Sequence, residues 1–162
     1  MSTSSATDPA IAGLGVPEAP LPTWDAAVAH AETLRAQGVD VSIDERRRLI
    51  EIRGTDGYRH DPDDGTPAYQ VFYPDGTPKW ISHYTDGWRH DPDDGTPAVQ
   101  WFYSDGTPMW ISHYTDGELH DPADGTPARQ GFYQDGKPER ISHWTDGKLV
   151  SEERFPPPTG EA

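Results

Sequence analysis

The stretch Gly57 to Asp86, GYRHDPDDGTPAYQVFYPDGTPKWISHYTD, decides the fold because the chain writes it three times in succession. The second copy spans residues 87–116 and the third spans residues 117–146, with no insertion or deletion between them. Twenty of the thirty positions are identical in all three copies. A fixed period in this range is typical of repeat proteins, in which each unit buries its apolar surface against its neighbours.

Each copy predicts a β-hairpin with a second tight turn behind it. In the first copy, two β-type runs, Ala68–Tyr73 and Lys79–Tyr84, flank the pair Asp75-Gly76, which is a strong hairpin signal. A second pair, Asp86-Gly87, leads into the next copy, and a loop over residues 61–67 returns the chain to the next strand. The predicted fold class is therefore mainly β, a meander of repeated β-hairpins.

The array begins before its obvious start and ends after its obvious end. Residues 39–56 match the repeats when shifted by thirty positions, which aligns Leu49–Asp56 with Lys79–Asp86. This match predicts a degenerate hairpin ahead of the three copies. Residues 147–150 begin a fourth copy that breaks off, which gives a β-hairpin repeat domain over residues 39–150. Residues 1–22 predict a disordered tail from their composition, and residues 151–162 a Pro-rich tail.

Residues 23–38 predict the one helix, a capping helix ahead of the array. Thr23 is a suitable N-cap and Gly38 a suitable end. Apolar residues recur between them at helical spacing: Trp24, Ala27, Val28, Ala31 and Leu34. The stripe favours a helix that covers the open end of the array, since sheet edges need such a cover. A partner-binding helix is the alternative.

Strand alternation sorts the side chains of each hairpin onto two faces. If Asp75-Gly76 is a two-residue turn, counting outward pairs Val71 with Trp80, Gln70 with Ile81 and Phe72 with Lys79. One face then carries Tyr69, Val71, Tyr73, Trp80, Ser82 and Tyr84. The other carries Ala68, Gln70, Phe72, Ile81 and His83, which recur unchanged in all three copies.

The first of these faces varies between copies. Its Val71–Trp80 pair becomes Trp101–Trp110 and then Gly131–Arg140. A buried position rarely accepts a change from Trp to Arg, so at least the end of this face should meet water. Alternation alone does not say which face is inside. The aromatic residues therefore form either an exposed binding surface or the main core.

Composition narrows the class of protein. Apolar residues make up 33 % of the chain, which predicts a thin structure with a modest core. The formal net charge of −15 disfavours nucleic acid and favours a basic protein partner or a cation. Cysteine is absent, which removes thiol chemistry and disulfides. No apolar run reaches membrane-span length and no signal-peptide pattern is visible, so the cytoplasm is the expected location.

Histidine offers a candidate metal site at the second turn. If Asp86-Gly87 is a two-residue turn, His83 lies opposite His90, and in the next copy His113 lies opposite His120. Such neighbours are close enough to share a zinc ion, or to act as a pH sensor. An ordinary repeated cross-strand pair is the alternative. At the array ends the pairing fails, since Arg53 would face His60 and His143 would face Val150.

The loop sequence DPDDG offers hard oxygens for calcium at Asp61, Asp63 and Asp64, although the order of ligands is not that of a calcium loop. The third copy places Ala123 where the first has Asp63. The same residues are explained by turn chemistry alone. No catalytic triad, phosphate loop or isolated carboxylate pair is present in the sequence, and we expect no enzyme and no obligatory cofactor.

The segments Phe72-Tyr73-Pro74-Asp75-Gly76 and Tyr84-Thr85-Asp86-Gly87, with their equivalents in the other copies, carry a resemblance. Over residues 39–150 the chain resembles MORN-repeat variants of bacterial and phage proteins, including antitoxins of the YwqK type. The resemblance implies an array of β-hairpins that binds a protein partner. The period of thirty residues is longer than the usual MORN unit, and the loop H-D-P-x-D-G-T-P is an addition to the plain pattern.

The leading hypothesis is a non-catalytic protein–protein binding module, antitoxin-like or immunity-like, whose acidic surface neutralises a basic partner. Aromatic and arginine residues are enriched at interfaces. On that ground the predicted binding surface consists of Tyr69, Trp80, Trp101 and Trp110, flanked by Tyr84 and Arg89. A glycan or cell-wall binder that uses the same aromatic residues is the alternative. Self-association through open sheet ends is also expected of such an array.

Overall fold

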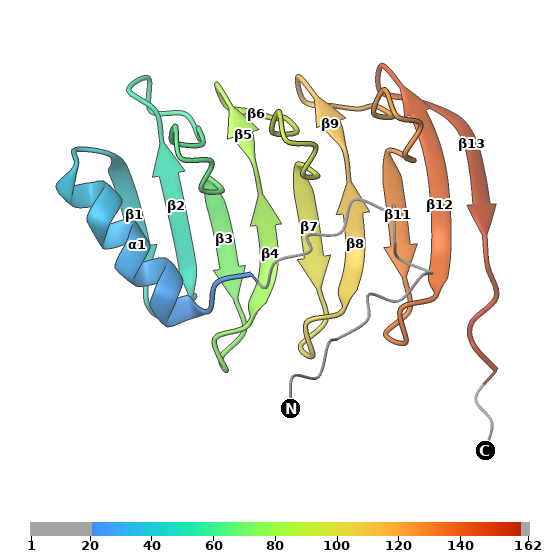
Figure 1. Ribbon diagram of the computed structural model, residues 1–162, viewed down its shortest axis with the longest axis horizontal. Helices are drawn as coiled ribbons and strands as arrows, with labels where there is room; N and C mark the ends of the chain where they lie inside the picture. Colours follow the sequence, from blue (N-terminus) through green and yellow to red (C-terminus); the bar gives the residue numbers. More distant parts are fainter. Residues whose placement is uncertain (1–20, 160–162) are drawn as a thin grey trace, which may run out of the picture.

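The computed structural model describes residues 21–159, so most of the predicted tail over residues 1–22 lies outside the described part. The fold is mainly β: one nine-stranded antiparallel sheet, two small two-stranded ladders and one N-terminal helix, α1 (Trp24–Ala36). The strands stand side by side in a single layer in chain order, as Figure 1 shows. The predicted fold class is confirmed.

The strands follow the repeats. The nine strands of the sheet are, in spatial order, β1 (Asp40–Asp44), β2 (Leu49–Arg53), β3 (Tyr69–Phe72), β4 (Pro78–Ser82), β7 (Val99–Phe102), β8 (Pro108–Ser112), β11 (Arg129–Phe132), β12 (Pro138–Thr145) and β13 (Lys148–Arg154). The two small ladders are β5 (Tyr84–Thr85) with β6 (Trp88–Arg89), and β9 (Tyr114–Thr115) with β10 (Glu118–Leu119). Each copy therefore contributes two strands to the sheet.

The hairpin turn at Asp75-Gly76 differs from the prediction. The amide of Gly76 donates to the carbonyl of Tyr73 at 2.9 Å, and the amide of Tyr73 donates to the carbonyl of Thr77 at 2.8 Å. Only Gly76 has a positive φ, of +91°, so the loop has three residues, a type I turn closed by a glycine bulge. Val71 still pairs with Trp80, but Phe72 pairs with Pro78 and not with Lys79.

The second turn is as predicted. Asp86 and Gly87 both have positive φ, 49° and 85°, which is the signature of a two-residue type I′ turn. Tyr84 pairs with Arg89 across it, and the amide of His90 donates to the carbonyl of His83 at 3.4 Å.

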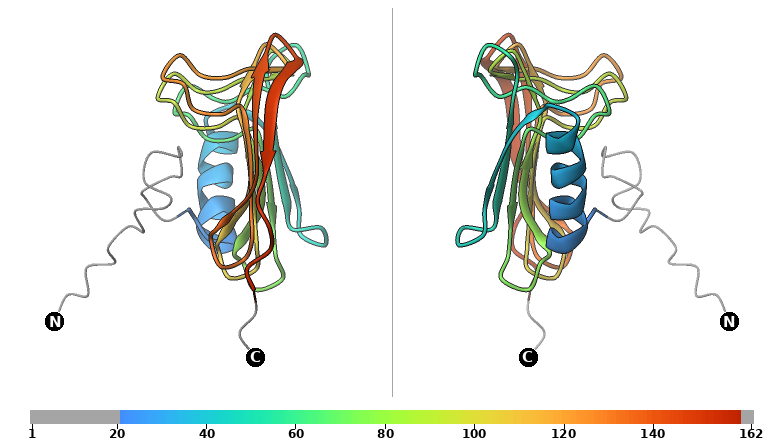
Figure 2. Two further views of the ribbon diagram at one scale, coloured as in Figure 1. Left: turned by 90° about the vertical axis from the view of Figure 1, so that its right-hand side faces the viewer. Right: turned by 90° about the vertical axis from the view of Figure 1, so that its left-hand side faces the viewer.

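Helix α1 packs across one face of the sheet at its N-terminal end (Figures 1 and 2). Its buried stripe is Trp24, Ala27, Ala31 and Leu34, close to the predicted one. The Trp24 ring meets Phe72 edge-on at 5.4 Å. Thr23 occupies the N-cap position without a side-chain cap, while the amide of Trp24 donates to the carbonyl of Gly76 at 2.8 Å. The helix thus covers a face of the first strands. The prediction had placed it over the open end of the array, and in this respect the prediction was wrong.

The two sheet faces are unequally buried. The side that carries α1 also carries the three loops of the repeats, as the side views in Figure 2 show. We call it the loop-side face, and its side chains are buried: Ala68, Gln70, Phe72, Ile81 and His83 in the first copy. We call the opposite side the outer face. Tyr69, Trp80, Trp101 and Trp110 on it are half-buried, whereas Ser82 and Tyr84 are buried. The residues that are identical in all copies therefore form the core.

Both ends of the array extend the repeat in altered form. The degenerate hairpin is confirmed as β1 and β2, although its second strand is offset by one residue, with Leu49 in the place of Trp80. Arg53 consequently faces Arg59, where we expected His60.

At the other end, β13 runs on to Arg154, beyond the predicted boundary at residue 150. His143 pairs with Ser151, and Val150 falls in a register shift. Strand β13 replaces the first strand of a further copy whose loop is missing. The Tyr133 hydroxyl donates to the carbonyl of Phe155, just as Tyr103 donates to Phe132. The described residues contain no helix with the length and apolar character needed to cross a membrane.

Candidate binding surface

The outer face carries a row of aromatic side chains across four neighbouring strands. Tyr69 from β3 meets Trp80 from β4 edge-on at 4.7 Å. Trp80 stacks on Trp101 of β7, with ring centroids 4.5 Å apart and planes 14° apart. Trp101 pairs in register with Trp110 of β8. We call these four residues the aromatic row; the predicted binding residues are thus brought together on one surface.

The row ends at Trp110, which leans onto the next strand. A Cβ atom added to Gly131 would lie 2.1 Å from Cζ3 of the Trp110 ring, so the indole occupies the space that a larger residue would fill. The guanidinium of Arg129 lies over the same ring, 4.3 Å from its centroid. The loss of an aromatic residue in the third copy therefore makes room for Trp110, and Arg129 closes the row.

Arginine and tyrosine form a second line beside the row. Arg59 lies over the Tyr69 ring at 4.5 Å and over the Tyr84 ring at 5.4 Å. Its Nε donates to Glu51 at 2.6 Å. Arg89, from the next copy, lies over the Tyr114 ring at 5.6 Å. The predicted flanking residues Tyr84 and Arg89 therefore adjoin the row, and Arg59 joins them.

Titration of Tyr84 reflects this positive environment. Burial acts to raise the pKa of its phenol, but hydrogen bonding to Arg89 and the charges of Arg89 and Arg59 outweigh burial. The pKa of Tyr84 lies below its ordinary value as a result. For Glu51, burial is likewise outweighed, here by the hydrogen bond and charge of Arg59, which hold the pKa of that carboxyl below its usual range.

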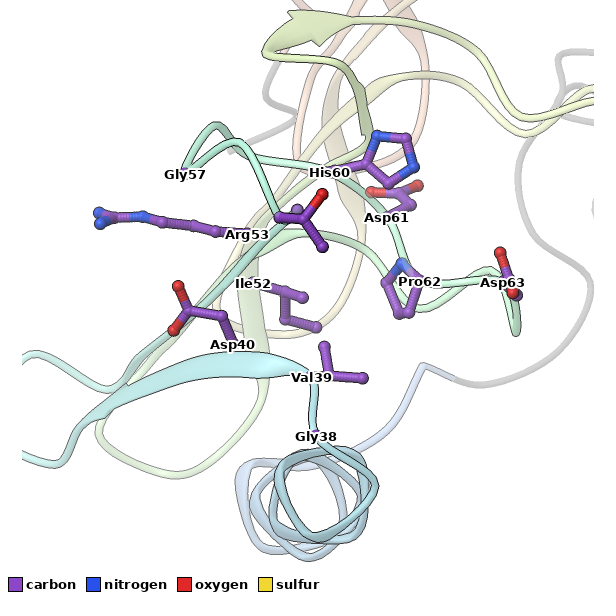
Figure 3. Close-up of a pocket in the computed structure, with 12 residues that line it drawn as sticks. Gly38, Val39, Asp40, Ile52, Arg53, Gly57, His60, Asp61, Pro62 and Asp63 are labelled. Carbon is purple, nitrogen blue, oxygen red and sulfur yellow. The ribbon is translucent and has the colours of Figure 1, made fainter.

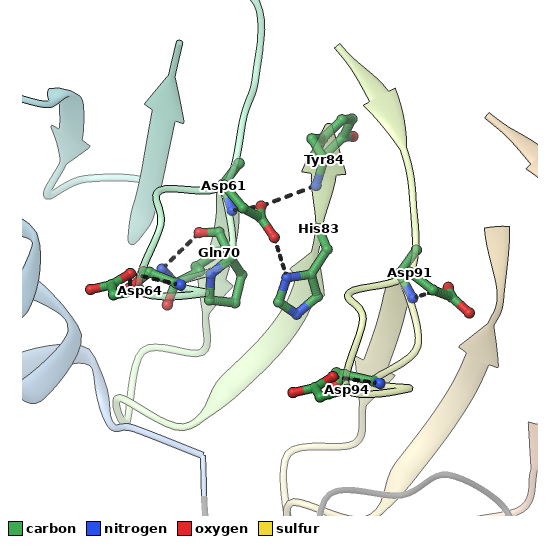
Figure 4. A network of polar contacts seen from close by, with 12 residues as sticks. Asp61, Asp64, Gln70, His83, Tyr84, Asp91 and Asp94 are labelled. Atoms are coloured by element: carbon green, nitrogen blue, oxygen red, sulfur yellow. Dashed lines mark hydrogen bonds and ion pairs between the residues drawn. The ribbon is translucent and has the colours of Figure 1, made fainter. Parts of the chain in front are cut away.

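The loop-side face is organised by an aspartate in each loop. Oδ1 of Asp61 accepts hydrogen bonds from the amides of Ala68 at 2.8 Å and Tyr84 at 3.0 Å. Oδ2 of Asp61 accepts from Nδ1 of His83 at 2.5 Å (Figure 4). The same three bonds recur at Asp91 with His113 and at Asp121 with His143. We call this unit the Asp–His brace; it fastens each loop to both ends of the hairpin that follows it.

Each brace also faces the loop of the next copy. Figure 4 shows the His83 ring between Asp61 and the loop that contains Asp94. Hydrogen bonds from Thr96 hold the pKa of Asp94 below its usual range, and the charge of His83 adds to this. The brace therefore lies at the contact between adjacent copies.

The predicted zinc pairs take different partners. His83 and His113 are buried and bonded to aspartates. Nδ1 of His90 accepts from the amide of Asp116 at 3.2 Å, and His120 makes the equivalent contact with Asp146. Within residues 21–159, no three His, Asp or Glu side chains are grouped so that they could hold a metal ion. The strand register behind the prediction is confirmed, since the amide of His90 donates to the carbonyl of His83 at 3.4 Å, and a zinc ion shared by the two imidazoles stays a prediction.

The predicted calcium loop is likewise occupied by internal contacts. All the hydrogen bonds of Asp61 belong to the brace. Oδ1 of Asp64 accepts from the amide and hydroxyl of Thr66, and its Oδ2 contacts His30 of α1 at 2.7 Å. Asp63 is exposed. The contacts of Asp61 and Asp64 hold the loop in shape, as the turn-chemistry alternative predicted.

A cavity of about 520 Å³ opens at the N-terminal end, between the end of α1 and the first loop (Figure 3). Ile52 lies there at the position that His83 fills in the next hairpin, and no loop precedes it. Two of the polar residues around the cavity have partners: His60 contacts Asp86, and Arg53 pairs with Glu51 at 3.2 Å. The cavity thus marks where the degenerate hairpin lacks a loop.

Sequence reasoning missed three features of these surfaces. Cross-strand counting did not join Asp61 to His83, although both are identical in all copies at a constant separation of 22 residues. Arg129 was not included in the predicted binding surface. Trp88 and Tyr58, which are 64 % and 65 % exposed on the second turns, were not predicted as surface aromatic residues. Their positions vary between copies, and this was the available signal.

No known protein-family model matches the chain, and no curated protein does either. The fold is that of a repeated β-hairpin array with regularly spaced His–Asp pairs.

Proposed function

We propose that this protein is a non-catalytic protein-binding module and that the aromatic row is its contact surface. The observation that carries the proposal is the placement of Tyr69, Trp80, Trp101 and Trp110 in a half-buried row on the outer face, away from α1 and the loops. Clustered Trp and Tyr with adjacent arginine are typical of the energetic centre of protein interfaces.

The packing of the rings favours a protein over a glycan. Sugar rings stack on the free face of an indole or phenol. Here Trp80 and Trp101 stack on each other, and Trp110 is covered by Arg129. One face of each of these three rings is thus already covered within the protein. The edges that remain suit the mixed polar and apolar surface of a protein.

The loop-side aspartates and histidines support a binding role over catalysis. Each brace satisfies main-chain amides and repeats three times, so its chemistry is that of a structural tie. The resemblance to MORN-repeat antitoxins extends the proposal to a partner that the protein neutralises, in the manner of an antitoxin or immunity protein.

The test replaces Trp80, Trp101 and Trp110 by serine together. Proteins captured by the wild-type chain are purified, and their affinities for the wild-type and variant chains are measured by calorimetry. We expect at least a hundredfold loss, since one interface tryptophan commonly contributes about 2 kcal/mol or more. Trp88→Ser is the matched control, because Trp88 is exposed but lies off the row.

Equal affinity of the triple variant, with an unchanged circular dichroism spectrum, would rule the row out. Selective retention on peptidoglycan or polysaccharide resin that depends on the same three residues would favour the glycan alternative.

A further inference from the structure

The aromatic row presents ring edges to the solvent. Trp80 and Trp101 lie on adjacent strands with nearly parallel planes, so their rings stand upright on the sheet. An aromatic ring carries negative charge density on its faces and positive density at its edge. Because Trp80 and Trp101 turn their faces toward one another, the edges of these two rings are the parts left to the solvent, and they are weakly electropositive.

Two arginines beside the row have no carboxylate partner within the described part of the chain. Arg59 pairs with Glu51, and Arg140 pairs with Glu152 at the far end. Between these ion pairs lie Arg89 and Arg129. Arg89 hydrogen-bonds to Tyr84 and lies over the Tyr114 ring, and Arg129 lies over the Trp110 ring, so neither positive charge is neutralised by a carboxylate among residues 21–159. Their charges are therefore available to a ligand.

The environment of Arg129 disfavours its positive charge. Burial lowers the pKa of its guanidinium and outweighs the opposing effect of Tyr114; the smaller effects of Arg140 and of its ion-pair partner Glu152 act in opposite directions. Its Nε is buried without a hydrogen-bond acceptor in the described residues. A bound carboxylate would supply Arg129 with the counter-charge that it lacks among the described residues.

The positive character is local, since the whole chain has a formal net charge of −15. Charges beyond about 8 Å are largely screened at physiological salt, so the groups in direct contact decide what binds. Arginine and ring edges are those groups on the outer face.

We propose that the aromatic row binds a carboxylate-bearing segment of its protein partner, with Arg89 and Arg129 pairing with Asp or Glu side chains. This inference rests on the proposed function and deepens it. It reverses, for this surface, the expectation of a basic partner that net charge suggests.

The first experiment measures the charge around the row without a partner. Tryptophan fluorescence is quenched by iodide and by caesium at matched ionic strength, each normalised to free N-acetyltryptophanamide. The background is Trp88→Phe, which removes the exposed tryptophan off the row. We expect the normalised iodide constant to exceed the caesium constant by about twofold or more, as local potentials of this kind produce.

Arg89→Gln with Arg129→Gln should remove the iodide preference. Lys137→Gln with Lys148→Gln is the matched control, because it removes the same charge from exposed lysines away from the row. A preference for caesium in the background protein, or an iodide preference that survives the arginine changes, would overturn the assignment.

The second experiment titrates the full chain with oligo-glutamate, oligo-lysine and oligogalacturonate. Binding of oligo-glutamate that is lost in both the arginine and the triple tryptophan variants supports the proposal. Oligo-lysine binding that depends on the row would overturn it while leaving the protein-binding function standing. Tighter row-dependent binding of oligogalacturonate would move the site to acidic glycans. If no probe depends on the row, the proposed function fails with the inference.

Discussion

The two faces of this sheet follow different rules. On the loop-side face, the residues Gln70, Phe72, Ile81 and His83 are buried and recur unchanged in the next two copies. On the outer face, the position of Trp80 becomes Trp110 and then Arg140, and the position of Tyr69 becomes Val99 and then Arg129.

The difference has a physical cause. The loop-side face must satisfy buried main-chain amides and close-packed side chains in every copy, and few residues can do so. On the outer face, the half-buried positions of the aromatic row tolerate exchange, while Tyr73 and the buried Ser82 recur in every copy. A repeat protein can therefore keep its framework on one side and change its binding chemistry on the other.

The largest expected effect comes from breaking a brace. Asp91→Ala removes the acceptor for the amides of Ala98 and Tyr114 and for His113. Leaving these groups unpaired should lower the free energy of unfolding by roughly 3–5 kcal/mol. Urea unfolding with an unchanged m-value measures it.

Asp93→Ala in the same loop is the control, since the third copy already carries Ala123 there. It should change the free energy of unfolding by less than about 0.5 kcal/mol. If the two variants are equally stable, the brace does not hold the loop-side face.

The sequence predicted the architecture well because period, alternation and Asp-Gly pairs are local signals. The register of Gln70 with Ile81 follows from them and is confirmed. The loop length at Asp75-Gly76 does not, since Pro74 can occupy the second position of a type I turn and shift the glycine to its end. An Asp-Gly pair alone fits both two-residue and three-residue loops.

The partner of His83 was beyond cross-strand counting. Asp61 reaches it because the loop folds back onto the sheet, and strand pairing says nothing about where a loop lands. The end of the array was misplaced for a similar reason. Strand β13 keeps the pairing of a repeat strand although its sequence has lost the loop and the aromatic residues.

A second prediction concerns close packing on the outer face, at the contact between Trp110 and Gly131. Gly131→Ala would place a methyl group 2.1 Å from the present position of Trp110 Cζ3, so the indole must move. We expect a loss of about 1–2 kcal/mol in unfolding free energy, smaller than for the brace because the ring can shift on an open face.

A double-mutant cycle isolates this contact. In a Trp110→Ser background the cost of Gly131→Ala should fall below about 0.5 kcal/mol, which gives a coupling energy of about 1 kcal/mol. An equal cost in both backgrounds would place the strain in the backbone of β11, and the outer face would then be uniformly tolerant of side-chain exchange.

The smallest effect concerns pH and the third brace. Burial acts to raise the pKa of Asp121, but hydrogen bonds from the amide of Trp144, from His143 and from the amide of Ala128 outweigh it. The native pKa therefore lies below the ordinary value of about 3.9.

A carboxyl whose pKa is lowered on folding stabilises the native state fully above its unfolded pKa. That stability is lost as the pH falls through the native pKa. In Asp121→Asn the amide oxygen can still accept from the two main-chain amides, but it does not titrate. We expect a loss of about 1 kcal/mol at pH 7, the difference between a charged and a neutral hydrogen bond. The variant should then lose correspondingly less stability than the wild type between pH 5 and the acid limit of about pH 2.

Asp93→Asn controls for the removal of one negative charge, and its curve of stability against pH should run parallel to that of the wild type. If the Asp121→Asn curve also runs parallel, the acid sensitivity resides elsewhere than in the brace. The loop-side and outer faces would then differ in packing alone and not in their response to pH.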